Sequence, residues 1–317
     1  MAARMRSSIA QTGQFSWFIK FILKLSLCLS LLSLTACSGH LVGVLAPKGV
    51  VAYQERKLFF DTLALMLIVV LPVIVMSLTF IYHYQASHQT EDYQPNWAHS
   101  YFLESLWWGI PCAIIVVLAV ITWKATHDLD PYKPITGHTE APLVIQAIAL
   151  PWKWLFIYPE QNIATLNFLE IPVGQQVELW ITTDNVPMSA FFVPQLGSQI
   201  YAMAGMRTRL HLLANELGVF EGLDTQYNGQ GFSDMHFAVH SVSRADMKAW
   251  VGRLQQTGKP LNQAVYHLLL NPSIANEPAF YAGVDPGLFE QVIDLYKNST
   301  GVSHPRSQQL KYHHQAY

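Results

Sequence analysis

Residues 63–81 are LALMLIVVLPVIVMSLTFI and residues 106–123 are LWWGIPCAIIVVLAVITW, two runs that contain no charged residue. Each run is close to the roughly 20 apolar residues that an α-helix needs to cross the hydrocarbon core of a bilayer. They predict two membrane-spanning helices, over about 58–82 and 104–123, in a transmembrane helical hairpin at 58–124. Pro72 lies in the middle of the first run and predicts a kink, most simply a packing feature without a function of its own.

The composition agrees with a membrane protein. The chain has 317 residues, of which 51% are hydrophobic and only 13% are charged, about half the usual charged share of a soluble domain. Its formal net charge of -2 excludes the basic surface that nucleic-acid binding requires. Three cysteines with unrelated contexts, Cys28, Cys37 and Cys112, exclude both a disulfide framework and a structural zinc site.

The N-terminus has the pattern of an export signal, in which Arg4 and Arg6 precede an apolar run at 25–32 and then small residues. The run ends in Leu34-Thr35-Ala36-Cys37, which resembles the bacterial lipobox. The resemblance predicts a lipoprotein signal peptide at 1–36, lipid attachment at Cys37 and an exported segment at 37–57. The alternative is an ordinary thiol at Cys37 beside an anchor that is not cleaved.

Two signals for membrane orientation disagree. Arg56, Lys57 and Lys124 flank the outer ends of the hairpin, and the connector 83–102 has no lysine or arginine, so a count of positive charges places the connector outside. The basic N-terminal signal instead places Cys37 and everything after about Lys124 outside. We give the signal more weight, because it orients the chain first. The large C-terminal domain is therefore expected on the extracytoplasmic side.

Short strand candidates separated by turn residues follow the hairpin. Turn signals such as Pro172-Val173-Gly174 and Asn228-Gly229 lie between them. This pattern predicts an all-β sandwich over 125–242. Ser243 followed by Asp246 is typical of a helix N-cap and opens a helical extension and polar tail at 243–317, with helices at about 244–256, 261–270 and 287–297. The expected strands are 143–150, 152–158, 177–182, 191–194, 207–214 and 235–239.

The stretches WKWLFIYPE at 152–160 and FFVPQLGSQIYAMAGM at 191–206 resemble subunit II of bo-type ubiquinol oxidases, most specifically over 197–213. The resemblance implies a cupredoxin-like sandwich in a multi-pass lipoprotein of the bacterial cytoplasmic membrane, with the sandwich on the periplasmic side. It implies a complex that oxidises ubiquinol, reduces oxygen and pumps protons. The partners would be subunit I, which holds the heme and copper, the smaller membrane subunits and membrane lipids. This chain would be a non-catalytic subunit that binds no cofactor.

Relatives of that family that carry a binuclear copper centre use a histidine before the strand at 191–194, then the pattern C-x-E-x-C-x3-H-x2-M. Two thiolates, two imidazoles and a thioether suit soft copper ions. Here only the methionine, Met235, is retained, and no cysteine follows Cys112. The sequence therefore predicts that no such copper pair is bound. The lost ligand positions are Ser189, Asp224, Gln226, Asn228 and Phe232.

Two other interpretations of this region were weighed. Asp224 with His211, His236 or His240 offers oxygen and nitrogen ligands for a different metal, but strand histidines with hydrogen-bond partners are the simpler interpretation. Trp152 and Trp154 match the aromatic region through which cytochrome c oxidases receive electrons. Without copper behind them, packing is the favoured role for both tryptophans.

Glu104 lies at the cytoplasmic start of the second span. By resemblance it matches a subunit II glutamate at the mouth of a proton-uptake channel in subunit I. The alternative, equally favoured, is a carboxylate that stabilises the positive end of the helix dipole. Asp61, near the outer end of the first span, is a weaker candidate of the same kind.

Three rival functions were considered. One is a cytochrome c oxidase subunit II with an altered metal site, and another is a stand-alone membrane lipoprotein of cupredoxin fold that acts as an assembly or binding module. An exported hydrolase is excluded, because the sequence has no G-x-S-x-G or H-E-x-x-H motif.

Overall fold

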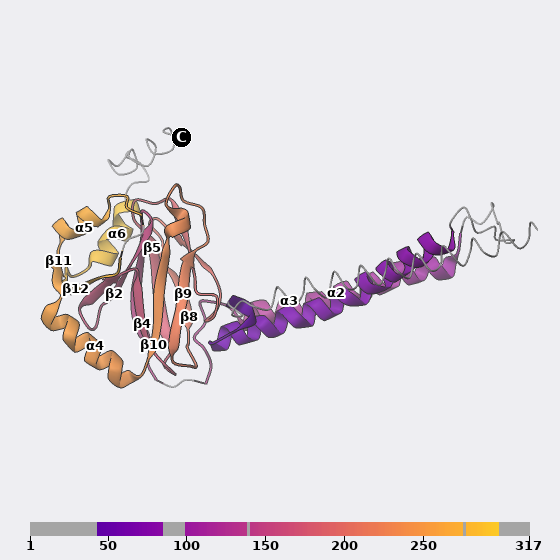
Figure 1. The fold of residues 1–317 in the computed structure, drawn as a ribbon, viewed down its shortest axis with the longest axis horizontal. Helices are drawn as coiled ribbons and strands as arrows, with labels where there is room; N and C mark the ends of the chain where they lie inside the picture. The colour runs from indigo at the N-terminus through magenta and orange to yellow at the C-terminus, as the bar shows by residue number, and fades with distance from the viewer. Residues whose placement is uncertain (1–42, 85–98, 138–139, 275–276, 298–317) are drawn as a thin grey trace, which may run out of the picture. The chain divides into compact units, whose positions relative to one another are not determined.

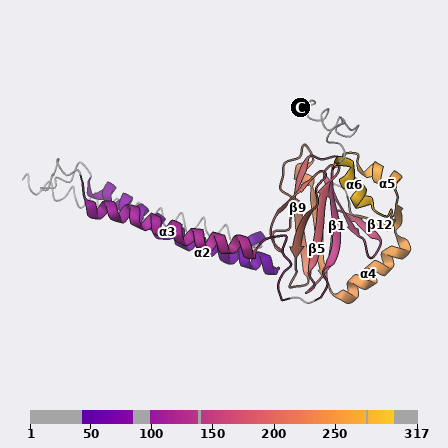
Figure 2. The ribbon, with the colours of Figure 1, turned by 180° about the vertical axis from the view of Figure 1, so that it is seen from behind.

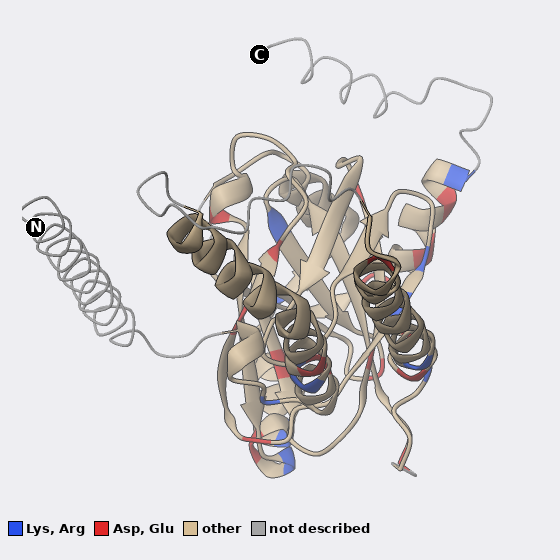
Figure 3. Cartoon of the chain, turned by 90° about the vertical axis from the view of Figure 1, so that its right-hand side faces the viewer, with Lys and Arg blue, Asp and Glu red and all other residues tan. Residues whose placement is uncertain are grey.

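The computed structural model describes residues 43–84, 99–137, 140–274 and 277–297. The predicted signal peptide and Cys37 lie outside these residues. A short 3-10 turn, η1 (Gly43–Leu45), precedes two long helices, α2 (Val50–His83) and α3 (Tyr101–Asp128). Both helices are long and apolar enough to cross a membrane. In Figure 3 most of their length carries no charged side chain. The prediction of two long apolar helices is therefore confirmed.

Both helices extend beyond their apolar runs. α2 begins at Val50, well before the uncharged run that starts after Asp61. Ser100 caps α3, since its side chain accepts a hydrogen bond from the backbone N–H of Leu103. Pro72 lies within the continuous helix α2.

The strands form two sheets, as predicted for a sandwich. Figure 2 shows β1, β5 and β12 of the larger one. The seven-stranded sheet has the order β11-β12-β3-β2-β1-β5-β8, and the five-stranded sheet has the order β4-β10-β9-β6-β7. The strands before the C-terminal extension are β1 (Leu143–Leu150), β2 (Lys153–Tyr158), β3 (Ile163–Leu166), β4 (Phe168–Pro172), β5 (Val177–Thr183), β6 (Met188–Phe192), β7 (Ile200–Met203), β8 (Thr208–Leu212), β9 (Gly218–Asp224) and β10 (His236–Val242).

The core lies on both faces of the seven-stranded sheet. Between the two sheets, the buried rings of Trp154, Phe156, Phe191 and Phe237 contact one another at centroid distances of 5.1–6.4 Å. The opposite face packs against the C-terminal extension. Because both faces are covered, β2 is buried along its whole length, which explains its apolar sequence without alternation.

The C-terminal extension contains α4 (Arg244–Thr257), α5 (Gln263–Leu269) and α6 (Leu288–Lys297), coloured orange to yellow in Figure 1. The predicted Ser243 cap is confirmed, because its hydroxyl accepts from the N–H of Asp246 at 3.1 Å.

The extension is not only helical, however. It also adds β11 (Lys259–Leu261) and β12 (Ala279–Val284) to the larger sheet. The expectation of a helical extension was therefore incomplete, because neither β11 nor β12 was among the predicted strands. The short segment of β12 becomes a strand because β3 offers it an edge to pair with.

Candidate functional site

The positions matched to copper ligands lie at one end of the five-stranded sheet. Ser189 is on β6, Asp224 is the last residue of β9, and Met235 directly precedes β10. All three are buried, with at most 4% of each residue exposed. Strand pairing of Phe191 with Asp224 brings β6 and β9 together here. Residues 225–235 connect β9 to β10 and close this end of the sheet.

Asp224 is the centre of a hydrogen-bond network. Its Oδ1 accepts from the backbone N–H of Ala190 at 3.0 Å and from that of Gln226 at 2.8 Å. Burial raises the pKa of the Asp224 carboxyl group, and the hydrogen bonds from Ala190, Gln226 and Ser189 partly offset this rise. The carboxylate thereby ties the start of the connecting loop to β6.

Asn228 joins the remaining side chains of this network. Its Nδ2 lies 3.3 Å from Ser189 Oγ, 3.4 Å from Asp224 Oδ2 and 3.2 Å from Met235 Sδ. The structure thus brings together four of the six positions that the sequence analysis named. The side chains of the other two, Gln226 and Phe232, are not part of the network. Gln226 contributes only its backbone N–H, and the ring of Phe232 packs on that of Tyr227 with their centroids 5.7 Å apart.

This set of side chains does not fit a binuclear copper centre. The centre requires two bridging thiolates and imidazoles, whereas the site offers a hydroxyl, a carboxylate, a carboxamide and one thioether. These groups hydrogen-bond to one another. The arrangement can hold a loop in place.

Trp152 covers the connecting loop, a role that the sequence analysis missed. Its Nε1 donates to the backbone carbonyl of Asn228 at 3.3 Å, and its backbone has a positive φ of 60°, unusual for a bulky residue. A Cβ atom at Gly231 would lie 2.5 Å from the indole ring. The glycines at 229 and 231 are the feature of the sequence that could have indicated this close approach of the Trp152 ring to the loop backbone. Trp154, by contrast, is fully buried in the core, which confirms its packing role.

The histidines proposed as alternative metal ligands do not converge on Asp224. Among the residues that the structure describes, no group of three or more metal-binding side chains is found. His236 is exposed and lies 3.1 Å from Glu221 Oε1, whereas Asp224 is buried.

His211 and His240 are held elsewhere. His211 Nδ1 lies 2.7 Å from Gln176 Nε2, and His240 packs on the ring of Phe168 at 4.6 Å. Burial lowers the pKa of both imidazoles. Each is a strand histidine with its own contacts.

The two membrane carboxylates lie on different helices. Glu104 is exposed in the first turn of α3, and its backbone N–H donates to Ser100 at 2.9 Å. Asp61 is exposed on α2, just before the uncharged run. The geometry of Glu104 suits both roles considered for it, a proton-accepting group and a carboxylate at a helix N-terminus.

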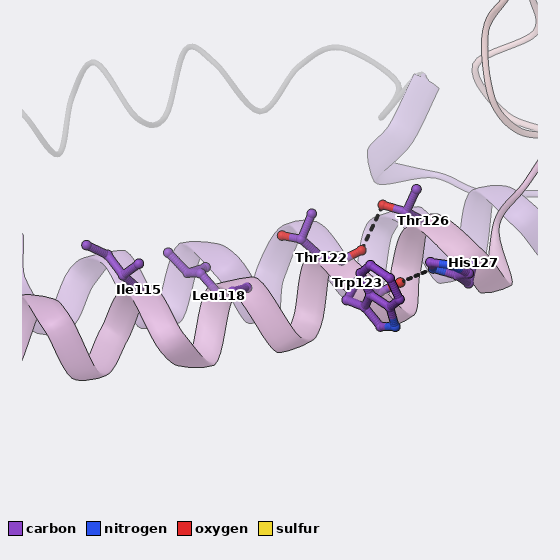
Figure 4. A pocket seen from close by; sticks show the side chains of 7 residues that line it. Ile115, Leu118, Thr122, Trp123, Thr126 and His127 are labelled. Carbon is purple, nitrogen blue, oxygen red and sulfur yellow. Dashed lines mark hydrogen bonds between the residues drawn. The ribbon is translucent and has the colours of Figure 1, made fainter.

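A shallow apolar groove of about 470 Å³ runs along the second half of α3 and includes Ile115, Leu118 and Trp123. Figure 4 shows that the side chains of Thr126 and His127 bond within the helix. Thr126 Oγ1 donates to the Thr122 carbonyl at 2.8 Å, and His127 Nδ1 lies 2.7 Å from the Trp123 carbonyl. The groove therefore offers a ligand mainly apolar contacts.

Known proteins resemble this chain in sequence and in structure. Residues 255–299 match the family model described as the COX aromatic rich motif. The chain is 46% identical over 252 residues to the cytochrome bo(3) ubiquinol oxidase subunit 2 of Pseudomonas aeruginosa, covering 80% of this chain and 76% of that protein. It is 45% identical over 262 residues to the ubiquinol oxidase subunit 2 of Acetobacter aceti, covering 82% and 85%.

Among solved structures, the chain resembles the periplasmic domain of subunit II of cytochrome oxidase from Bradyrhizobium japonicum. The identity is 23%, the match covers 36% of this chain and 94% of that one, and the TM-score is 0.35. The relatives identical at 45–46% match most of both chains, and they establish the family. The chain belongs to the ubiquinol oxidase subunit 2 family.

Proposed function

We propose that this chain is the non-catalytic subunit II of a proton-translocating terminal oxidase that transfers electrons from ubiquinol to oxygen. The redox centres, heme and copper, belong to subunit I, against which the two helices pack together with the smaller membrane subunits. The large domain lies on the periplasmic side of the cytoplasmic membrane. The identity to ubiquinol oxidase subunits over most of the chain supports this assignment.

The network around Asp224 is the observation that carries the proposal. It fills the place of the copper ligands with side chains that bond to one another, namely Ser189, Asn228 and Met235. A quinol delivers its electrons from within the bilayer, so a quinol oxidase needs no electron entry site in its outer domain. Loss of the thiolates and retention of the sandwich are consistent with this chemistry.

Two finer assignments belong to the proposal. Cys37 carries the lipid that supplements the two helices as a membrane anchor, and mass spectrometry of the mature N-terminus tests it. Glu104 collects protons at the cytoplasmic side and passes them to subunit I, because a carboxylate at that depth is expected to face protein or water rather than lipid.

The decisive experiment is purification of the complex from membranes through an affinity tag on this chain. A heme-bearing polypeptide is expected to co-purify, and the complex should oxidise ubiquinol with consumption of oxygen. A stand-alone lipoprotein would purify without heme.

The full-length chain purified without its partners tests the copper assignment. Metal analysis should find no stoichiometric copper, and the absorption spectrum should lack thiolate–copper bands. Two coppers per chain with such bands would instead support the cytochrome c oxidase alternative.

A further inference from the structure

The segment Gln195–Ser198 belongs to the stretch 191–206, one of the two that resemble the oxidase family, yet it takes no part in the Asp224 network. It lies between β6 and β7 and contacts the residues that lead into α2. These contacts join the sandwich to the first membrane helix at a point far along the sequence from the 125–142 connection.

The start of α2 is capped by the sandwich. The first N–H groups of a helix have no partner within it, and the N-cap residue Gly49 has no side chain to supply one. Backbone carbonyls of the sandwich take that role: the N–H of Gly49 donates to the carbonyl of Gln195 at 3.0 Å, and the N–H of Lys48, just before the cap, donates to the same carbonyl at 2.7 Å. The N–H of Ala52 donates to the carbonyl of Leu196 at 3.3 Å.

Side chains and a second loop strengthen the same contact. Ser198 Oγ donates to Glu55 Oε1 at 2.5 Å. On the other side, Gly49 forms a β-bridge with Ala214, and Lys48 forms an ion pair with Glu216 at 2.5 Å. The head of α2 is therefore held between two loops of the sandwich.

Two glycines make this close approach possible. A Cβ atom at Gly49 would lie 2.5 Å from the Leu196 carbonyl oxygen and 2.7 Å from that of Leu213, both rigid backbone atoms. Gly49 has φ -121° and ψ 160°, an extended conformation open to any residue, so only sterics require glycine there. A Cβ atom at Gly197 would lie 3.0 Å from that of Val51.

We infer that residues 48–55, 195–198 and 213–216 form a clamp that makes α2 and the sandwich one rigid body. The part of α2 before its uncharged run, Val50–Asp61, is about 18 Å long at the α-helical rise. The clamp at its head therefore sets the height and rotation of the sandwich relative to the membrane. This inference does not depend on the oxidase function.

Hydrogen exchange of the full-length chain in nanodiscs tests the clamp. Gly49→Ala is expected to raise the exchange rate of the Ala52 amide about tenfold or more, as expected for local opening, while β1 and β5 stay protected. Gly252→Ala is the matched control, because a Cβ atom at this glycine in α4 meets nothing within 4 Å; it should leave Ala52 unchanged. Unchanged exchange at Ala52 in Gly49→Ala would overturn the inference.

A milder variant keeps the test decisive if Gly49→Ala also exposes β1 and β5. Ser198→Ala removes the hydrogen bond to Glu55 without adding an atom, and it should raise exchange across 50–56 about threefold with the sandwich intact. The opposite pair of results would contradict the clamp: in Gly49→Ala the strands β1 and β5 exchange faster, while in Ser198→Ala residues 50–56 exchange at the wild-type rate. These contacts would then serve the fold of the sandwich and not the attachment of α2.

Discussion

A buried carboxylate that is held by hydrogen bonds is the most distinctive feature of this domain at the scale of single residues. Asp224 is only 4% exposed, and burial of a charge is costly unless hydrogen bonds compensate. Two backbone N–H groups and Asn228 supply them. The carboxylate thus ties the start of the loop 225–235 to β6.

Replacement of Asp224 tests this role. Asp224→Ala leaves the N–H groups of Ala190 and Gln226 without their acceptor, and it should lower the free energy of unfolding by about 2 kcal/mol. Thermal unfolding of the full-length chain in detergent, followed by tryptophan fluorescence, measures the change. The control is Asp234→Ala in the same loop, where the side chain is exposed and little effect is expected. Equal effects of the two variants would contradict a special role for Asp224.

A second buried carboxyl group makes stability depend on pH. Glu170 on β4 is 6% exposed. Burial raises its pKa from 4.5 to about 7; the positive charge of Arg253 opposes this shift, and the negative charge of Asp246 adds to it. Protonated Glu170 is therefore favoured in the folded chain. The stability that it contributes is fully present below about pH 4.5 and is lost as the pH rises through about 7.

Glu170→Gln should remove this dependence. The unfolding midpoint of the wild-type chain minus that of the variant is expected to fall as the pH rises from about 5 to 8, because only the wild type has to ionise a buried group. Thermal unfolding curves of the wild type and the variant, recorded across this pH range, measure the difference between their midpoints. A difference that does not change with pH would show that Glu170 titrates normally.

At the scale of elements, buried charged residues of the sandwich hold the C-terminal extension. Asp184, fully buried at the end of β5, accepts hydrogen bonds from Tyr266 at 2.7 Å and Tyr296 at 2.8 Å. Lys153 on β2 donates to the carbonyl of Asn271 at 2.8 Å, and burial lowers its pKa to about 8. The two tyrosines lie in the segment that matches the aromatic rich motif.

Arg207 provides a third anchor, for α6. Its guanidinium lies 4.5 Å from the ring centroid of Trp180 and 5.9 Å from that of Phe289, and it forms an ion pair with Glu290. A cation between two rings is more strongly held than one in water. This side chain therefore connects the loop before β8 to both β5 and α6.

Arg207→Met should loosen α6 while leaving the two sheets in place. Hydrogen exchange of peptides from 288–297 is expected to rise about tenfold. Arg209→Met is the matched control, since Arg209 is half exposed and its Nε is 3.8 Å from Glu178, a geometry worth little. If α6 exchanges equally in both variants, the rings and Glu290 do not anchor it.

At the scale of the whole molecule, the helices and the sandwich have separate tasks. The long uncharged runs of α2 and α3 are suited by length and composition to cross a membrane. In the sandwich, as far as the structure describes it, no group of three or more metal-binding side chains is found. Glu104 on α3 lies at the expected cytoplasmic side, and it is the residue of this chain for which we propose a part in proton transfer.

Replacement of Glu104 in the assembled complex tests that part. Glu104→Ala should lower quinol-oxidase turnover and the rate of proton uptake severalfold, because a titratable group at the channel mouth is lost. Stopped-flow measurements with a pH dye in purified complex report both. Glu160→Ala, an exposed carboxylate on the sandwich, should leave the rates unchanged. Wild-type rates in Glu104→Ala would reduce Glu104 to a helix-capping carboxylate.

Local features of the sequence were sufficient for much of this description. The apolar runs at 63–81 and 106–123 predicted both membrane helices, and the strand at 143–150 was predicted with its observed bounds. The absence of any cysteine after Cys112 excludes a thiolate-bridged copper pair in the sandwich. These features could be predicted because each is a property of single residues or of short segments. This holds for hydropathy, for β-propensity and for the identity of a possible ligand atom.

The tertiary structure decided what depends on distant segments meeting. β12 became a strand because β3 offered it an edge. Trp152 covers a loop more than 70 residues away, and Gly49 is required by carbonyl groups near 196 and 213. Sequence spacing carries no information on such approaches, because they are set by how the two sheets pack. The sequence therefore determined that the sandwich has no cysteine to bind copper, and only the fold decided that Asp224 and Asn228 hold the loop 225–235.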